Sequence, residues 1–119
     1  MSETILVAVE DALLREFTTA TLRLYGYTVM VASDAEGAAA MASRHQASIH
    51  LLITDINPGP NGTGINVLIT RRHPNLRFLY LFGHKDEGAR LRALGPRVGL
   101  LHKLFLPMSL ARKVREILG

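Results

Sequence analysis

Five apolar, strand-like segments that alternate with helical patterns predict an α/β fold for this chain of 119 residues. The segments are Thr4–Val9, Tyr27–Ala32, Ile49–Thr54, 77–83 and 98–103. Short and nearly continuous apolar runs are typical of strands covered on both faces. Strands and helices that alternate across short loops imply right-handed crossovers and a parallel sheet. We therefore expect an open parallel sheet of five strands between two layers of helices.

The first helix is expected directly after Thr4–Val9. Its apolar positions step by three and four residues, as along one side of a helix, and are Leu13, Phe17, Ala20 and Leu24. Asp11 can cap the start of this helix, and Gly26 can end it.

The other helices follow the later strands. Ser33 with Glu36 three residues on is a capping-box pattern before an Ala-rich second helix. A third helix is expected over 64–73, where Pro74 stops it, and a short fourth one over 85–95. The last helix should span Pro107–Leu118, with the proline in its first turn. Its inward face should carry Leu110, Val114 and Ile117.

Composition and charge exclude several classes of protein. There is no cysteine, which excludes a disulfide scaffold and a thiolate metal site, and no apolar run approaches the length of a membrane span. The acidic start of the chain argues against a signal peptide, so we expect a single cytoplasmic domain over residues 1–119. Residues 1–70 hold three basic and seven acidic residues, whereas residues 71–119 hold eleven and three. This asymmetry indicates an acidic partner or nucleic acid or, more simply and as we favour, solvated helix faces.

Charged residues follow several of the predicted strands at their carboxyl ends, where open α/β sheets bind ligands. They are Glu10 and Asp11 after the first strand, Asp55 after the third and Lys103 after the fifth. Carboxylates can hold Mg²⁺, and a carboxylate can attack phosphorus to form an acyl phosphate, whose oxygens a lysine would neutralise. Taken singly, each residue has a simpler reading: a helix cap for Asp11, an Asx-turn for Asp55 and a solvated strand end for Lys103.

The segments ILVAVED, LLREF, GYTVMVASDAEGA, LLITDI, RFLYLFG, LLHKLF and LARKVREIL resemble, in this order, the receiver domains of two-component response regulators. The resemblance covers almost the whole chain. It implies a doubly wound, flavodoxin-like (βα)5 sandwich with strand order 2-1-3-4-5. It also implies a signalling module, not an enzyme, that accepts a phosphoryl group from a sensor histidine kinase or a phosphotransfer protein. By this resemblance Asp55 is the phosphoacceptor and Lys103 contacts the phosphate.

The chain departs from the family pattern at several positions of the site. Val9 stands where the first residue of an acidic pair is usual, and Glu10 is the second. Phe82 replaces the hydroxyl residue that bonds the acyl phosphate, and Leu100 replaces the aromatic residue that moves with it. Leu104 replaces the proline after the lysine. The remaining ligands for Mg²⁺ are Glu10, Asp55 and the main-chain carbonyl of Asn57, with Asp11 as a further candidate. We therefore expect weak Mg²⁺ binding and impaired phosphorylation and switching.

Three functional hypotheses stay open. The chain is a receiver phosphorylated on Asp55, a phosphorylation-independent pseudo-receiver that binds proteins, or a small enzyme or nucleotide binder that shares only the architecture. The glycines Gly59, Gly62 and Gly64 match neither the dinucleotide fingerprint nor a Walker loop. The basic C-terminal region predicts an acidic protein partner, whereas nucleic acid and membrane are not expected as partners of this domain.

Overall fold

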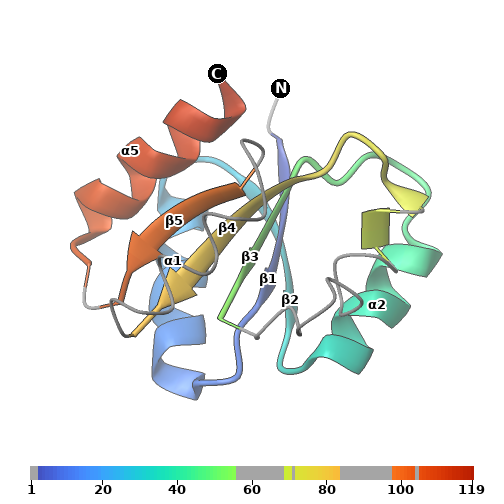
Figure 1. The fold of residues 1–119 in the computed structure, drawn as a ribbon, viewed down its shortest axis with the longest axis horizontal. Helices are drawn as coiled ribbons and strands as arrows, with labels where there is room; N and C mark the ends of the chain where they lie inside the picture. The colour runs from blue at the N-terminus through green and yellow to red at the C-terminus, as the bar shows by residue number, and fades with distance from the viewer. Residues whose placement is uncertain (1–2, 56–68, 71, 84–97, 104) are drawn as a thin grey trace.

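The computed structural model describes residues 3–55, 69, 70, 72–83, 98–103 and 105–119. Its five strands form one parallel sheet in the order β2-β1-β3-β4-β5, which confirms the predicted topology. The strands are β1 (Thr4–Ala8), β2 (Thr28–Ala32), β3 (Leu51–Thr54), β4 (Arg77–Phe82) and β5 (Val98–His102). Their carboxyl ends point to the bottom of Figure 1. The two helices predicted over 64–73 and 85–95 lie mostly or wholly outside the described residues.

Three helices are described in full: α1 (Ala12–Leu24), α2 (Ala35–Arg44) and α5 (Pro107–Leu118). Helices α1 and α5 cover one face of the sheet and α2 covers the other, so that the sheet is the middle layer (Figure 1). The chain is thus the three-layer α/β sandwich that the alternation of strands and helices predicted.

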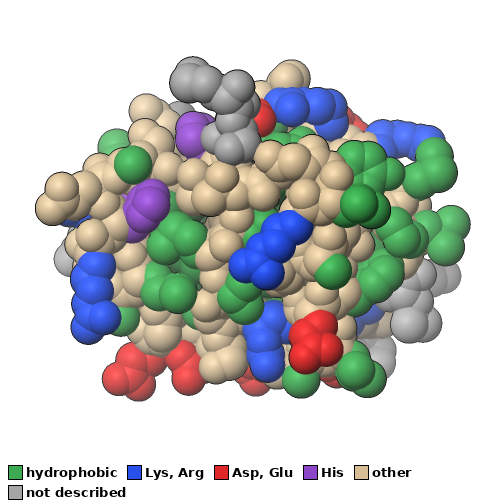
Figure 2. Space-filling view, turned by 180° about the vertical axis from the view of Figure 1, so that it is seen from behind, with side chains coloured by type: hydrophobic (Ala, Val, Ile, Leu, Met, Phe, Trp, Pro, Cys, Tyr) green, Lys and Arg blue, Asp and Glu red, His purple; other side chains and the backbone are tan. Residues whose placement is uncertain are grey.

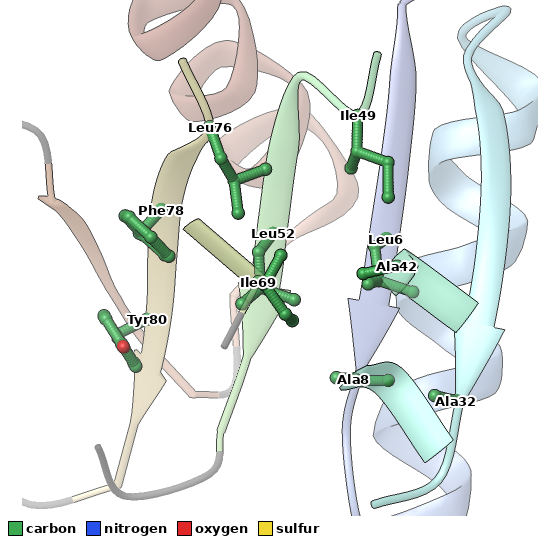
Figure 3. Close-up of a cluster of buried hydrophobic side chains, with 11 residues drawn as sticks. Leu6, Ala8, Ala32, Ala42, Ile49, Leu52, Ile69, Leu76, Phe78 and Tyr80 are labelled. Carbon is green, nitrogen blue, oxygen red and sulfur yellow. The ribbon is translucent and has the colours of Figure 1, made fainter. Parts of the chain in front are cut away.

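Alternate side chains of each strand feed two separate cores. In β1, Ile5 and Val7 pack toward α1 and α5, whereas Leu6 and Ala8 face α2. All four side chains are fully buried, because the sheet is covered on both faces. Figure 3 shows the core on the α2 side, where Phe78 and Tyr80 of β4 lie in line along one face of their strand. This double burial explains why the strands read as continuous apolar runs.

The ends of the helices agree with the sequence in two places and differ in one. The side chain of Asp11 caps α1 by accepting a hydrogen bond from the Leu14 amide at 2.9 Å, and Gly26 follows α1 with a φ of 92°. The predicted capping box at Ser33 is wrong. The cap of α2 is Asp34, whose carboxylate accepts from the Gly37 amide at 2.6 Å, because the helix begins one residue later than predicted.

The apolar spacing in the sequence predicted the buried face of α5 correctly but not that of α1. In α5, Leu110 and Val114 are fully buried and Ile117 packs against the same core, as predicted. In α1 the spacing of the apolar residues predicted the helix correctly, but these residues do not face the core. Leu13 and Leu24 are exposed, whereas the buried side chains of α1 are Thr18, Thr19, Thr21 and Leu22.

In the part of the chain that the structure describes, no helix has the length and apolar character needed to cross a membrane.

Candidate functional site

Asp55 lies directly after β3 at the carboxyl edge of the sheet, and its side chain is only 6% exposed. One carboxylate oxygen, Oδ1, accepts a hydrogen bond from the backbone amide of Glu10 at 3.0 Å. The other, Oδ2, lies 3.7 Å from Nζ of Lys103. Since Glu10 follows β1 and Lys103 follows β5, a single carboxylate ties together the ends of three strands.

Lys103 is positioned by the backbone of the neighbouring strand. Its amide donates to the carbonyl of Phe82, the last residue of β4, at 2.8 Å. The side chain is 36% exposed, so the ammonium group lies at the mouth of the site, where it can reach an incoming anion. At this distance the pair with Asp55 is a loose ion pair that leaves the lysine able to turn to a bound phosphoryl group.

Two carboxylates follow β1, and α1 adds a guanidinium group beside them. Val9 is fully buried and belongs to the core on the α1 side, so its position offers no ligand. The side chain of Glu10 is exposed, and that of Asp11 is engaged as the cap of α1. Arg15, on the first turn and a half of α1, donates to the carbonyl of Val9 at 2.9 Å and to that of Glu10 at 3.2 Å.

Arg15 is a site residue that the sequence did not reveal. Its six-residue distance from Val9 carries no motif, and only the fold shows that the helix turns its guanidinium group back over the strand end. The end of β1 therefore carries a cationic group from Arg15, and the Asp55 carboxylate has a second cationic group, Lys103, as its ion-pair partner.

The described residues fit Mg²⁺ poorly. Among them, no three or more acidic or histidine side chains gather as metal ligands do. The carboxylates of Glu10 and Asp55 are the acidic groups at the ends of β1 and β3 that no helix cap engages, and the guanidinium group of Arg15 lies against the same strand end. Mg²⁺ prefers several oxygen ligands and gives up its water reluctantly, so these described residues alone are a poor set of ligands for it. The carbonyl of Asn57 lies outside the described residues.

Phe82 and His102 form an aromatic pair across the ends of β4 and β5. Their ring centroids lie 5.1 Å apart at an interplanar angle of 87°, which is the favourable edge-to-face arrangement. Nδ1 of His102 also lies 2.8 Å from the carbonyl of Lys103. Leu100 lies two residues before His102 in β5, where it pairs with Tyr80 of β4. Its side chain packs against the core on the α2 side. An apolar ring thus takes the place at the end of β4 where a hydroxyl group would bond a phosphate.

Acidic side chains are concentrated at the carboxyl edge of the sheet. Figure 2 shows them along the lower edge of the molecule, and the residues that follow β1, β2 and β3 are Glu10, Asp11, Asp34, Glu36 and Asp55. The acidic residues of the first half of the sequence therefore lie mainly at the carboxyl edge of the sheet.

The comparison with solved structures finds close matches along nearly the whole chain. A response regulator receiver protein of Sinorhizobium medicae is 28% identical and superposes with a TM-score of 0.79, over 98% of this chain and 94% of the other. The receiver domain of the hybrid histidine kinase CckA is 26% identical, with a TM-score of 0.78 over 98% and 99% of the two chains. Chemotaxis protein CheY4 of Vibrio cholerae is 24% identical and shares the fold, with a TM-score of 0.80 over 99% and 100%. The structure identifies a receiver domain.

No family model matches the sequence of this receiver domain, and no curated protein matches it. The likeness is thus carried by the tertiary structure and by a few motifs. Receiver domains generally bind Mg²⁺ at an acidic site and interact with histidine kinases or phosphotransfer proteins.

Proposed function

We propose that this receiver domain is a phosphorylation module whose acceptor is Asp55 and whose Mg²⁺-dependent phosphorylation and switching are impaired. The observation that supports an acceptor is the placement of the Asp55 carboxylate 3.7 Å from Nζ of Lys103 at the carboxyl edge of the sheet. In the reaction a carboxylate oxygen attacks the phosphorus of a phosphohistidine or acyl phosphate donor. The P–N or P–O bond to the donor breaks, and Lys103 offsets the charge on the transferred phosphoryl group.

The impairment rests on what surrounds the acceptor. Val9 offers no carboxylate, and Phe82 cannot donate a hydrogen bond to an acyl phosphate. The phosphoryl group would therefore meet Lys103 without the metal and hydroxyl contacts that lower the barrier to its transfer. Each such contact is worth about 2–4 kcal/mol in comparable sites, so losing even one slows the reaction at least tenfold.

The alternative is a phosphorylation-independent pseudo-receiver that acts as a protein-binding module. The observation that favours it is that both carboxylate oxygens of Asp55 already have partners within the fold. In that case Asp55 stabilises the fold by linking the ends of β1, β3 and β5. The Phe82–His102 pair then holds the end of β4 in one conformation.

We infer that the module works in the cytoplasm as a signalling partner and not as an enzyme, with its unit spanning residues 1–119. Its phosphodonor is a sensor histidine kinase or a phosphotransfer protein. The C-terminal region adds a candidate surface for an acidic protein. On α5, Arg112 is exposed, but Lys113 and Arg115 are already engaged with Glu116 and Glu3. Of these three basic residues, Arg112 is therefore the one most available to an outside partner.

The deciding experiment is an intact-mass measurement after incubation with acetyl phosphate, with and without Mg²⁺, on the chain and on the variant Asp55→Asn. Partial addition of one phosphoryl group that Asp55→Asn abolishes and Mg²⁺ enhances only weakly is the expected result. Complete, strongly Mg²⁺-dependent modification would contradict the impairment. No modification under any condition would favour the pseudo-receiver.

A further inference from the structure

Helix α1 carries large apolar side chains on its outward side and buried hydroxyl groups on its inward side. Leu13 is 79% exposed and Leu24 is 83% exposed, whereas Thr18 is fully buried. The hydroxyl groups of Thr18 and Thr19 are buried and have no hydrogen-bond partner among the described residues. Exposed leucines and buried, unpaired hydroxyls both cost free energy in an isolated domain. This arrangement indicates a helix whose outward face is used for binding.

The exposed apolar residues form a continuous line along α1, which we call the α1 stripe: Leu13, Phe17, Ala20 and Leu24. They are spaced by four, three and four residues, which is the a/d spacing of helices that pair side by side. With 3.6 residues per turn, all four lie on one side of the helix, and Thr18 and Leu22 lie on the side toward the core. The sequence thus carries a helix-pairing seam that the domain itself does not cover.

The α1 stripe continues onto the start of α5. The rings of Phe17 and Phe105 have centroids 5.7 Å apart, and next to Phe105 in the chain Leu106 is 69% exposed and Met108 is 64% exposed. Figure 2 shows hydrophobic side chains gathered along one flank of the molecule, at the right of that view, on the side where α5 lies. Contiguous apolar surface of this kind marks a site of protein–protein contact.

The charged residues beside the α1 stripe indicate which kind of partner fits this surface. Glu16 and Arg23 are both exposed and lie seven residues apart, so they share one flank of the stripe. When a second copy of α1 lies antiparallel across the first, Glu16 of each copy faces Arg23 of the other. The same alignment sets Leu13 against Leu24 of the second copy. It also sets Phe17 against Ala20 of that copy, so that a large side chain meets a small one.

We propose that this receiver domain forms a two-fold symmetric dimer through the α1 stripe, with the two α1 helices antiparallel. The palindromic spacing of the stripe and the opposite charges of Glu16 and Arg23 make the surface complementary to itself, as a two-fold interface requires. A helix of 13 residues is only about 20 Å long, so the interface is small and the dimer is weak and concentration-dependent.

The first test is sedimentation equilibrium of the full chain over a wide range of concentrations. We expect reversible dimerisation, and at least tenfold weaker association for Leu13→Ser and for Leu24→Ser. These side chains are largely exposed, so the variants should keep the thermal midpoint of the parent chain. A monomer at every concentration would overturn the proposal, as would a dimer that both variants leave unchanged. Binding of a foreign amphipathic helix without self-association would also overturn it.

The second test uses charge exchange to establish the antiparallel arrangement. Glu16→Arg alone and Arg23→Glu alone should each weaken the dimer severalfold, because each brings like charges together across the two-fold axis. The double variant restores both cross-copy pairs and should return association to within about twofold of the parent. The matched control is the same exchange on α2, at Glu36 and Arg44, which should have no effect. Failure of the double variant to recover would exclude the antiparallel alignment.

Discussion

Asp55 combines two requirements that normally oppose each other. As the proposed phosphoacceptor it must present a free oxygen, yet a carboxylate that is only 6% exposed must have its charge compensated. The backbone amide of Glu10 and the ammonium group of Lys103 provide that compensation, one for each oxygen. Because the contact with the lysine is the longer of the two, Oδ2 is the oxygen that the proposed phosphorylation would use.

The first prediction concerns the two residues that depart most from an efficient phosphorylation site. Val9→Asp combined with Phe82→Thr should raise the rate of Asp55 phosphorylation by acetyl phosphate by more than the product of the two single effects. The metal and the hydroxyl group act on one transition state, so their contributions should be coupled. Each single variant should gain less than about tenfold and the double variant at least a hundredfold.

Intact-mass time courses with Mg²⁺ measure these rates, and Asp55→Asn in the double-variant background provides the control for the site of modification. Two small gains that simply multiply would show that the metal and the hydroxyl group do not cooperate here. Val9 is fully buried, so the thermal midpoint of each variant should be recorded alongside the rates.

The second prediction compares two buried threonines that differ in hydrogen bonding. The hydroxyl group of Thr18 has no partner among the described residues, whereas that of Thr54 donates to the carbonyl of Ala8 at 2.7 Å. Thr18→Val should therefore stabilise the fold by about 1 kcal/mol, and Thr54→Val should destabilise it by about 1–2 kcal/mol. Urea denaturation of both variants measures the free energies of unfolding. Effects of equal sign would show that Thr18 has a partner in solution.

At the scale of elements, the contact between β5 and α5 depends on a missing side chain. A Cβ atom added at Gly99 would collide with Cδ1 of Ile117 and lie 3.1 Å from its Cγ1. Ile117 belongs to the inward face of α5 that was predicted from the sequence. Glycine at the middle of β5 thus leaves room for the Ile117 side chain, which would have to shift to accommodate a larger residue.

The third prediction follows from that contact. Gly99→Ala should destabilise the domain by about 1–3 kcal/mol, because the added methyl group overpacks the helix–strand contact. Ile117→Val removes Cδ1 and alone should cost about 1 kcal/mol. In the double variant the costs should be less than additive by at least 0.5 kcal/mol, roughly the threshold for coupled neighbours. Additive costs in urea denaturation would mean that α5 shifts away from β5 and not that the two side chains collide.

Helix α1 shows that one element can satisfy two surfaces. Its inner side packs through Leu22 and Leu14 onto the core shared with α5, and its outer side carries the α1 stripe. The inner side therefore includes buried threonines, whereas several large apolar side chains of α1 lie on its outer side.

At the scale of the molecule, a surface ion pair joins the two ends of the chain. Nη2 of Arg115 in α5 lies 2.7 Å from Oε2 of Glu3, directly before β1, and Nη1 of Arg115 lies 3.5 Å from the hydroxyl group of Tyr27. The hydrogen bond from Arg115 holds the pKa of the Glu3 carboxyl below its usual value. Because the group is partly exposed, solvent and salt screen the pair and its contribution to stability is small.

The fourth prediction is the pH dependence of that contribution. A carboxyl whose pKa is lowered in the folded state stabilises the fold above its unfolded pKa, near 4.5, and this stabilisation is lost as the pH falls through the lower folded value. Glu3→Gln should therefore slightly lower the urea midpoint at pH 7 and leave it unchanged at pH 3. The difference at pH 7 should shrink in 0.5 M salt. An equal loss at both pH values would indicate a packing effect instead of an ionic one.

The order and type of the five strands and of the three fully described helices could be predicted from the sequence, together with the residues at the strand ends. Strands buried on both faces need apolar runs, and caps such as Asp11 and Gly26 act within a few residues, so both leave local patterns. The alternation of strands with helices then brings Asp55 and Lys103 to the same edge of the sheet, because parallel strands end at one edge. These features follow from neighbours along the chain and from general rules of connection.

The partners that those residues meet depend on contacts between distant segments, which the fold alone reveals. It placed the guanidinium group of Arg15 over the end of β1 and paired the ring of Phe82 with that of His102. It also turned the α1 stripe outward, although its spacing is the same as that of a buried stripe. Periodicity records that one side of a helix is apolar but not which side the sheet covers. That choice depends on the summed packing of α1 against β1, β2 and α5, and contacts between distant segments leave no periodic trace in the sequence.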